Sequence, residues 1–270
     1  MQQFVTTITR DPFITKFHGE IEQMTPVSLR MDETNRAMLF RNFTKRRKEI
    51  NWCIKNNRNY YYIDCGYFGN SGPKKMFHRI VKNNIQHENP RYDLPSDRFD
   101  DQCRAAERVQ HSPRFKGWKK DGRAILVAPV SNKSCTFYGY TLNQWLDHTL
   151  AELKKHTDRP IIVRERPIRQ LRIQQNSIYH QFDKDNIFAL VTYNSLAATE
   201  AIGYGIPTFT SAPCAANAMC SQDLSKIETP YYPDEDKVRA WQNWLAYCQF
   251  RPHELATEVP LKIIDSLGLN

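Results

Sequence analysis

The sequence contains no uninterrupted apolar run of about 18 residues, the length that a helix needs to cross the hydrocarbon core of a bilayer. We therefore expect no membrane-spanning helix. The start, MQQFVTTITRDPF, has neither a basic leader followed by an apolar core nor a cleavage pattern, so export is not expected either. These absences favour a cytoplasmic protein without a membrane partner.

Several motifs of familiar chemistry are also missing. The chain has no G-x-G-x-x-G, no Walker loop, no H-E-x-x-H and no C-x-x-C. Its seven cysteines are an odd number without the paired short spacing of zinc sites, so we expect reduced thiols. Two acidic triplets, 183–185 and 234–236, are interpreted as a turn and as a helix start. No metal site is therefore predicted.

What is present is a globular composition with a positive charge. Hydrophobic residues make up 40% and aromatic residues 12% of the 270 residues, enough to build a core in one large domain or two modest ones. The formal net charge is +9, and such an excess attracts polyanions over long distances. Nucleic acid is therefore the first partner that the composition predicts.

The most informative stretch runs from Asn186 to Phe209 and predicts a strand, a helix and a second strand. The apolar run Ile187–Val191 is typical of a buried strand, and the small polar residues 192–195 lead into a helix of alanines. Gly203 and Gly205 end that helix, and residues 206–209 form the second strand.

The junction in this unit is a candidate anion site. A helix N-terminus presents unpaired N–H groups and partial positive charge, so a phosphate would bind near Thr192, Asn194 and Ser195 without a metal. Glu200 lies too far along the helix for a capping box and could accept hydrogen bonds from a ribose. The alternative is that Ser195 only caps the helix and that Glu200 is a solvated glutamate.

At these residues the chain resembles a known family. The segment VTYNSLAATEAIGYGIPTF is similar to the donor-binding segment of GT-B glycosyltransferases, in which a serine-led helix meets the nucleotide diphosphate and a glutamate meets the ribose. The resemblance continues over roughly residues 123–258, through RAILVAPVSNKSCTFYG, TDRPIIVRERP, DLSKIETPYYPD and WLAYCQFRPHEL. Together these segments resemble small phage sugar-transfer enzymes associated with DNA base hypermodification.

The rest of the second half supplies further strands, helices and donor-site candidates. Strands are expected at 124–130 and 161–163, followed respectively by a polar loop with Lys133 and by Arg164, two cations that could pair with a diphosphate. A surface ion pair is the alternative for Arg164. Thr141 and Gln144 match a capping box, the long loop 210–222 could close over a substrate, and a last long helix begins near Asp234.

The first half is expected to hold the catalytic base. A strand at Tyr60–Ile63 runs into Asp64 and a glycine-containing loop, which makes Asp64 our first candidate for the base and His78 the second. The alternative for Asp64 is a residue that hydrogen-bonds its own turn. A helix is expected from about Asn35 to Asn56. Candidates for contact with nucleic acid are Lys45, Arg46, Arg47, Lys74, Lys75 and Arg79, whose alternative is a solvated basic face.

The expected fold class is α/β, with two doubly wound, Rossmann-like domains facing a cleft in a GT-B architecture. Residues 1–115 would form an acceptor-side domain with a basic face, and residues 120–250 would bind the nucleotide sugar. Residues 251–270 would pack back on the first domain, as the resemblance implies.

The resemblance and the charge together predict a metal-independent hexosyl- or pentosyltransferase without a cofactor. Its substrate would be a nucleotide sugar, with UDP-sugar the first choice. The acceptor would be a 5-hydroxymethylpyrimidine, such as hydroxymethylcytosine, in double-stranded bacteriophage DNA, and the protein would act as a monomer in the host cytoplasm. One alternative is transfer to a surface polysaccharide or small glycoside. The other is a non-catalytic nucleic-acid-binding protein.

Overall fold

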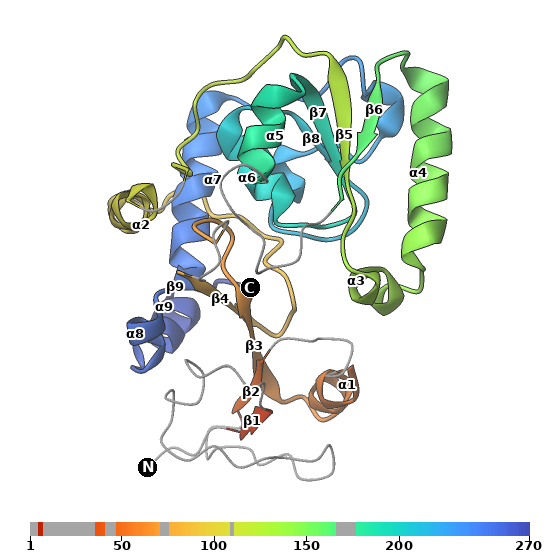
Figure 1. Ribbon diagram of the computed structural model, residues 1–270. Helices are drawn as coiled ribbons and strands as arrows, with labels where there is room; N and C mark the ends of the chain where they lie inside the picture. Colours follow the sequence, from red (N-terminus) through yellow and green to blue (C-terminus); the bar gives the residue numbers. More distant parts are fainter. Residues whose placement is uncertain (1–4, 8–35, 41–46, 71–75, 109–110, 166–176) are drawn as a thin grey trace. The chain divides into compact units, whose positions relative to one another are not determined.

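The computed structural model describes residues 5–7, 36–40, 47–70, 76–108, 111–165 and 177–270 (Figure 1). Their contacts divide into two compact units. Unit 1 takes its residues from Met1–Gly66, Met76–His87 and Tyr247–Asn270, and unit 2 from Tyr67–Lys75 and Glu88–Ala246. Residues 88–115, which we expected in the first domain, fall in unit 2 by this division. The roles expected of the two domains stay predictions.

Unit 2 is built on a four-stranded parallel sheet with the strand order β6-β5-β7-β8. All residues of the two central strands are buried, which explains why their sequences are almost continuously apolar rather than alternating. The strands predicted in this half of the chain are therefore confirmed. Their bounds are β5 Ala124–Ala128, β6 Ile161–Val163, β7 Ile187–Thr192 and β8 Thr208–Thr210.

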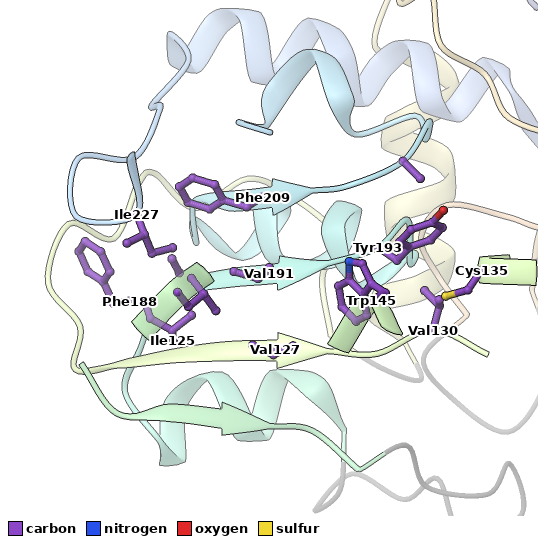
Figure 2. Close-up of a cluster of buried hydrophobic side chains, with 13 residues drawn as sticks. Ile125, Val127, Val130, Cys135, Trp145, Phe188, Val191, Tyr193, Phe209 and Ile227 are labelled. Carbon is purple, nitrogen blue, oxygen red and sulfur yellow. The ribbon is translucent and has the colours of Figure 1, made fainter. Parts of the chain in front are cut away.

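Helices cover both faces of this sheet. On one face, Trp145 and Leu153 of α4 (Leu142–His156) pack against alternate residues of β5 and β7. Figure 2 shows Trp145 beside Val127 and Val191 in this cluster. On the other face, α5 (Ile178–Lys184) and α6 (Ala197–Tyr204) contribute Phe182 and Ala201 to a second cluster. A register shift at Ala124/Ile125 interrupts the pairing of β5 with β7.

Local signals define the ends of α4 and α6. Thr141 and Gln144 form the predicted capping box, in which the Thr141 hydroxyl accepts from the Gln144 amide at 3.2 Å and the Gln144 side chain accepts from the Thr141 amide at 2.9 Å. Gly205 ends α6 in the left-handed conformation, at φ 87°. A Cβ there would lie 2.0 Å from the carbonyl oxygen of Gly117. Both the left-handed conformation and this close approach therefore require glycine.

The remaining helices of unit 2 either hydrogen-bond to distant segments of the unit or directly follow one of its strands. The predicted last long helix is confirmed as α7 (Glu235–Tyr247), whose Gln242 accepts from the Phe115 amide at 3.1 Å and donates to the Pro113 carbonyl at 2.7 Å. Gln102 of α2 (Asp97–Glu107) donates to the Ala246 carbonyl at 2.9 Å. A short helix, α3 (Asn132–Phe137), follows β5. Two 3₁₀ helices, η3 (Asn217–Met219) and η4 (Leu224–Lys226), follow β8.

Unit 1 contains a mixed sheet with the strand order β1-β2-β3-β4-β9. The first three strands are parallel, but β4 runs antiparallel to β3, and β9 antiparallel to β4. The expectation of a doubly wound parallel sheet is therefore wrong for this unit, because β3 and β4 pair as direct antiparallel neighbours. The bounds are β1 Val5–Thr7, β2 Arg36–Phe40, β3 Asn59–Cys65, β4 His78–Lys82 and β9 Gln249–Phe250.

One predicted helix of unit 1 is only partly correct. Instead of a single helix over 35–56, the chain forms strand β2 and then α1 (Arg47–Lys55). Residues 36–40 pair in register with 59–63 of β3, so a long-range ladder overrides the local helical pattern. The predicted strand at Tyr60–Ile63 is confirmed inside β3.

The C-terminal residues of unit 1 form α8 (Pro252–Leu255) and α9 (Val259–Leu267). Asp265 of α9 accepts from the Tyr61 hydroxyl at 2.7 Å and pairs with Lys82 at 2.7 Å, so the helix is bonded to both β3 and β4. Within the described ranges, no helix reaches the length and apolarity that crossing a membrane requires.

Candidate functional site

The candidate donor site lies at the carboxyl ends of β5 and β7 in unit 2. The chain leaves β5 toward β6 on one side and then returns to β7 on the other, so the strand order reverses between β5 and β7. Ligands of open α/β sheets bind at such a reversal, beyond the carboxyl ends of the strands. Thr192 links the two strands here, because its buried hydroxyl donates to the Ala128 carbonyl at 2.6 Å.

The start of α6 presents backbone N–H groups at this edge. Within the described chain, the amides of Asn194, Ser195 and Leu196 have no hydrogen-bond acceptor, whereas the Ser195 hydroxyl accepts from the Ala197 amide at 3.2 Å. The capping role considered for Ser195 is therefore present. The three preceding amides are a separate set of donors, and together with the helix dipole they form a suitable place for a phosphate.

Glu200 lies in the first turn of α6 and is half-buried. Its neighbour Tyr179 is marked by no sequence motif, and the pKa of Tyr179 is raised well above its usual value by burial and then by the charge of Glu200. Tyr179 stacks on His111 with ring centroids 4.4 Å apart. Burial, followed by the nearby charge of Lys116, lowers the pKa of His111. Only spatial proximity identifies these aromatic neighbours, since they are distant from Glu200 in the sequence.

Arg164 is also at the carboxyl edge of this sheet. It follows β6 directly, and its amide donates to the Val127 carbonyl at 2.8 Å, extending the pairing with β5. Its guanidinium donates to the side chain of Gln181 on α5, and this bond orients the cation from a neighbouring helix. Lys133, the other predicted cation, lies in α3 just beyond β5. The topology therefore brings Lys133, Arg164 and the start of α6 to one edge of one sheet.

An aromatic wall supports the junction that precedes α6. The centre of the Tyr193 ring lies 5.8 Å from that of Trp145 and 6.0 Å from that of Tyr138. Burial raises the pKa of Tyr193 to about 12. The Trp145 indole donates to the Ser211 hydroxyl at 3.0 Å, while the Ser211 amide donates to the Tyr193 carbonyl at 3.0 Å. These contacts bind the ends of β7 and β8 together and make the junction rigid.

The loop that we expected to close over a substrate is instead packed into unit 2. Within 210–222, the side chains of Cys214, Ala215 and Met219 are buried, and Trp241 of α7 donates to the Ala215 carbonyl at 2.8 Å. Asn217 accepts from the Thr210 hydroxyl at 3.0 Å. This loop is part of the scaffold in the structure, and the interpretation as a lid is corrected.

Asp64, the first catalytic candidate of unit 1, belongs to a hydrogen-bonded cluster. Asp64 accepts from the Tyr62 hydroxyl at 2.9 Å through one oxygen and from the Cys65 amide at 2.7 Å through the other. Its bond to its own turn, the alternative considered above, is therefore present as well. Arg79 lies 3.9 Å away, and His78, the second candidate base, is 1% exposed.

Of the residues predicted to contact nucleic acid, most are not placed by the structure. Lys45, Arg46, Lys74 and Lys75 lie outside the described residues, and Arg47 begins α1. Arg79 is 5% exposed and donates to the Cys65 carbonyl at 2.9 Å. A guanidinium buried in this way cannot reach a DNA backbone, so the interpretation of Arg79 as a DNA contact is corrected.

A cavity of about 760 Å³ lies at the opposite edge of the unit 2 sheet, beside the amino ends of β5 and β6. One of the basic residues in its lining, Arg159, donates to Glu228 at 2.9 Å and to the Gly122 carbonyl at 2.5 Å, and its guanidinium lies 3.7 Å from the centre of the Phe188 ring. Because ligands of such sheets bind at the carboxyl edge, we assign the candidate donor site there and not to this cavity.

The acidic triplet at 183–185 also has a structural explanation. Asp183 accepts from the Tyr204 hydroxyl at 2.6 Å and pairs with Lys119 at 3.3 Å. The lysine also lies 4.2 Å from the centre of the Tyr204 ring. The carboxylate therefore joins α5 to the C-terminal end of α6.

Comparison with known proteins adds information on the fold. No family model matches the chain, and no curated protein matches it in sequence. Among solved structures, the chain is similar to KpsC of Thermosulfurimonas dismutans, a beta Kdo 2,7 transferase, with 12% sequence identity, a TM-score of 0.50 and 88% of each chain covered. At this identity the likeness concerns the fold alone, and the chain shares its α/β fold with a glycosyltransferase.

Proposed function

We propose that the protein is a glycosyltransferase that takes its sugar from a nucleotide-sugar donor bound to unit 2. The observation that carries this proposal is the set of three amides at the start of α6, which have no acceptor in the described chain. They lie where the strand order of a parallel sheet reverses, in a fold shared with a glycosyltransferase. This combination suits a leaving group that carries phosphate.

The proposed chemistry follows the charge. As the glycosidic bond of the donor breaks, negative charge grows on the departing phosphate oxygens, and donors already aimed at that position stabilise it. The amides before α6 would bind one phosphate, and Arg164, oriented by Gln181, would neutralise its charge. Glu200 would accept from the ribose hydroxyls. No step in this scheme requires a metal ion.

Asp64 is the proposed base for the acceptor hydroxyl. The Asp64 carboxylate is held by Tyr62 and Cys65, and its side chain is 21% exposed, so an acceptor hydroxyl has a surface from which to approach it. His78 is the weaker candidate, because a base must approach the hydroxyl to about hydrogen-bond distance and this side chain is buried.

The finer features of the proposal come from the sequence. The GT-B arrangement and a UDP donor rest on the sequence resemblance. The hydroxymethylated pyrimidine acceptor rests on that resemblance and on the net charge of +9. The solved neighbour is titled a Kdo transferase, so an activated form of this acid sugar belongs among the donors to be tested.

The test is a transfer assay with radiolabelled donors. The donors are UDP-hexoses, UDP-pentoses and activated Kdo, and the acceptors are DNA with 5-hydroxymethylcytosine, unmodified DNA and a panel of glycans. Transfer to any acceptor, or donor hydrolysis that stops in an Arg164→Ala variant, supports the proposal. Absence of binding, hydrolysis and transfer with every donor would overturn it. Label on modified DNA alone selects the predicted acceptor, and label on glycans alone selects the alternative.

A further inference from the structure

Asp64 is held from three directions by groups of unit 1. Tyr62 precedes it by two residues in β3, so both side chains lie on the same face of the sheet. Arg79 of β4 is directly opposite Asp64 in the antiparallel pair and lies on that face too. The Cys65 amide supplies the third donor from the backbone. The carboxylate therefore lies at the end of β3 in a pre-built set of donors.

Tyr62 is the one member of this set whose whole side chain is inaccessible. It is 0% exposed, and its hydroxyl donates to Oδ2 of Asp64 at 2.9 Å, while the Cys65 amide donates to Oδ1 at 2.7 Å. Because these two donors bind different oxygens, rotation of the carboxylate would break both hydrogen bonds. Arg79 is tied to the Cys65 carbonyl at 2.9 Å and stands farther from the carboxylate, at 3.9 Å.

We propose that Tyr62 is a positioning residue that orients the Asp64 carboxylate and keeps it ionised for its action on the acceptor. This inference rests on the proposed function, because it gives Asp64 a role in the reaction. Tyr62 itself acts only through Asp64. A hydrogen bond donated to the charged form of an acid favours that form, so removing the hydroxyl should make the carboxylate easier to protonate.

The surrounding titratable groups support this division of roles. In the described part of unit 1, Tyr62 and Cys65 from β3 and Arg79 from β4 lie around Asp64, and His87 beyond β4 lies near Arg79. Burial, and then the charge of Asp64, raises the pKa of Tyr62 well above its usual value, so the phenol remains a donor at neutral pH. Burial, and then Arg79, lowers the pKa of His87 to about 3, so this imidazole is neutral.

Tyr62→Phe is the main test, and Tyr61→Phe is its matched control. Tyr61 is the adjacent residue of β3, is equally buried, and also donates to a carboxylate, that of Asp265 on α9. We expect Tyr62→Phe to lower kcat about tenfold, to leave the donor KM unchanged and to move the acid limb of the pH-rate profile up by about one unit. Tyr61→Phe should leave kcat and the acid limb in place. Equal effects of the two variants would overturn the proposal.

A second measurement does not require activity. The ¹³C signal of the Asp64 carboxyl, assigned by its loss in Asp64→Asn, reports the protonation of that group directly. Its titration midpoint should rise in Tyr62→Phe and fall when 3-fluorotyrosine, a stronger acid, replaces tyrosine at position 62. A midpoint that does not respond to either change would overturn the inference. Failure of the wild-type protein to bind any donor would overturn the proposed function instead, and the titration would still decide the role of Tyr62.

Discussion

At the scale of single residues, the functional candidates differ in how firmly the structure holds them. Asp64 and Arg164 have side-chain partners in the described chain that orient them. Ser195 uses its hydroxyl to accept from the Ala197 amide and leaves the backbone to meet a ligand. Glu200 lies beside the buried Tyr179, whose pKa is raised by burial and then by the charge of Glu200. Because the contacts of each residue are defined, a substitution at any of these positions removes a known interaction.

Replacing Glu200 tests its proposed contact with the ribose. Glu200→Ala should weaken nucleotide binding about tenfold, because hydrogen bonds to a charged group are lost, and should leave the thermal unfolding temperature nearly unchanged. Isothermal titration calorimetry with UDP and with other nucleotides measures the effect. Glu152→Ala in α4 is the control, since that carboxylate pairs only with Lys155 and His156 among the described residues. Equal affinities in the two variants would contradict the ribose role.

Ser195 allows capping to be separated from anion binding. Ser195→Asp keeps an oxygen for the Ala197 amide and adds a negative charge at a helix N-terminus, so stability should be equal or slightly higher. The same charge should repel a phosphate and abolish donor binding. Ser195→Ala should lose about 1 kcal/mol of stability instead and retain most of the affinity. Calorimetry measures the donor affinity of the two variants, and thermal unfolding measures their stability. Undiminished donor binding by Ser195→Asp would mean that the phosphate binds elsewhere.

At the scale of elements, α6 depends on how its C-terminal end meets a distant segment. Gly205 is left-handed, its carbonyl accepts from the Lys119 amide at 2.7 Å, and a Cβ would meet the Gly117 carbonyl. The turn that ends the helix is thus pressed against residues 117–119. A larger residue at position 205 should therefore displace α6, including its first residue, which lies eight positions earlier in the chain.

Gly205→Ala and Gly139→Ala form a matched pair for this contact. Both glycines have φ 87°, but a Cβ at Gly139 meets nothing within 4 Å. Gly139→Ala should therefore cost only the strain of the left-handed conformation, about 1 kcal/mol. Gly205→Ala should cost several times as much, since the clash involves the backbone. Urea unfolding measures both free energies. Equal losses would mean that the contact with Gly117 gives way easily.

At the scale of the whole molecule, the net charge of +9 gives a prediction that does not depend on any one residue. Binding to duplex DNA should weaken steeply as salt rises, because condensed cations are released from the phosphates. Fluorescence anisotropy with a short duplex between about 50 and 200 mM salt measures the slope. Binding that is absent at low salt, or that does not respond to salt, would count against a DNA acceptor. Arg79→Ala should leave the slope unchanged, since this side chain is buried.

Sequence reasoning anticipated unit 2 better than unit 1. The apolar runs of β5 and β7, the capping box at Thr141 and the glycine after α6 are local signals, and each lies where it was expected. In unit 1 the local pattern of 36–40 predicts a helix, but pairing with β3 makes this segment a strand. The basic residues around Arg79 predict a surface position for it, but it lies opposite Asp64 and is buried.

The sequence by itself determined the strand-helix-strand unit around Ser195 and Glu200, since hydrophobic periodicity, caps and glycines act over a few residues. Only the tertiary structure decided which distant groups meet: the reversal of strand order between β5 and β7, the stack of His111 on Tyr179, and the donors around Asp64. These depend on strand pairing between segments far apart in the chain, and pairing of this kind is decided by the total burial and hydrogen bonding of the fold rather than by local preference.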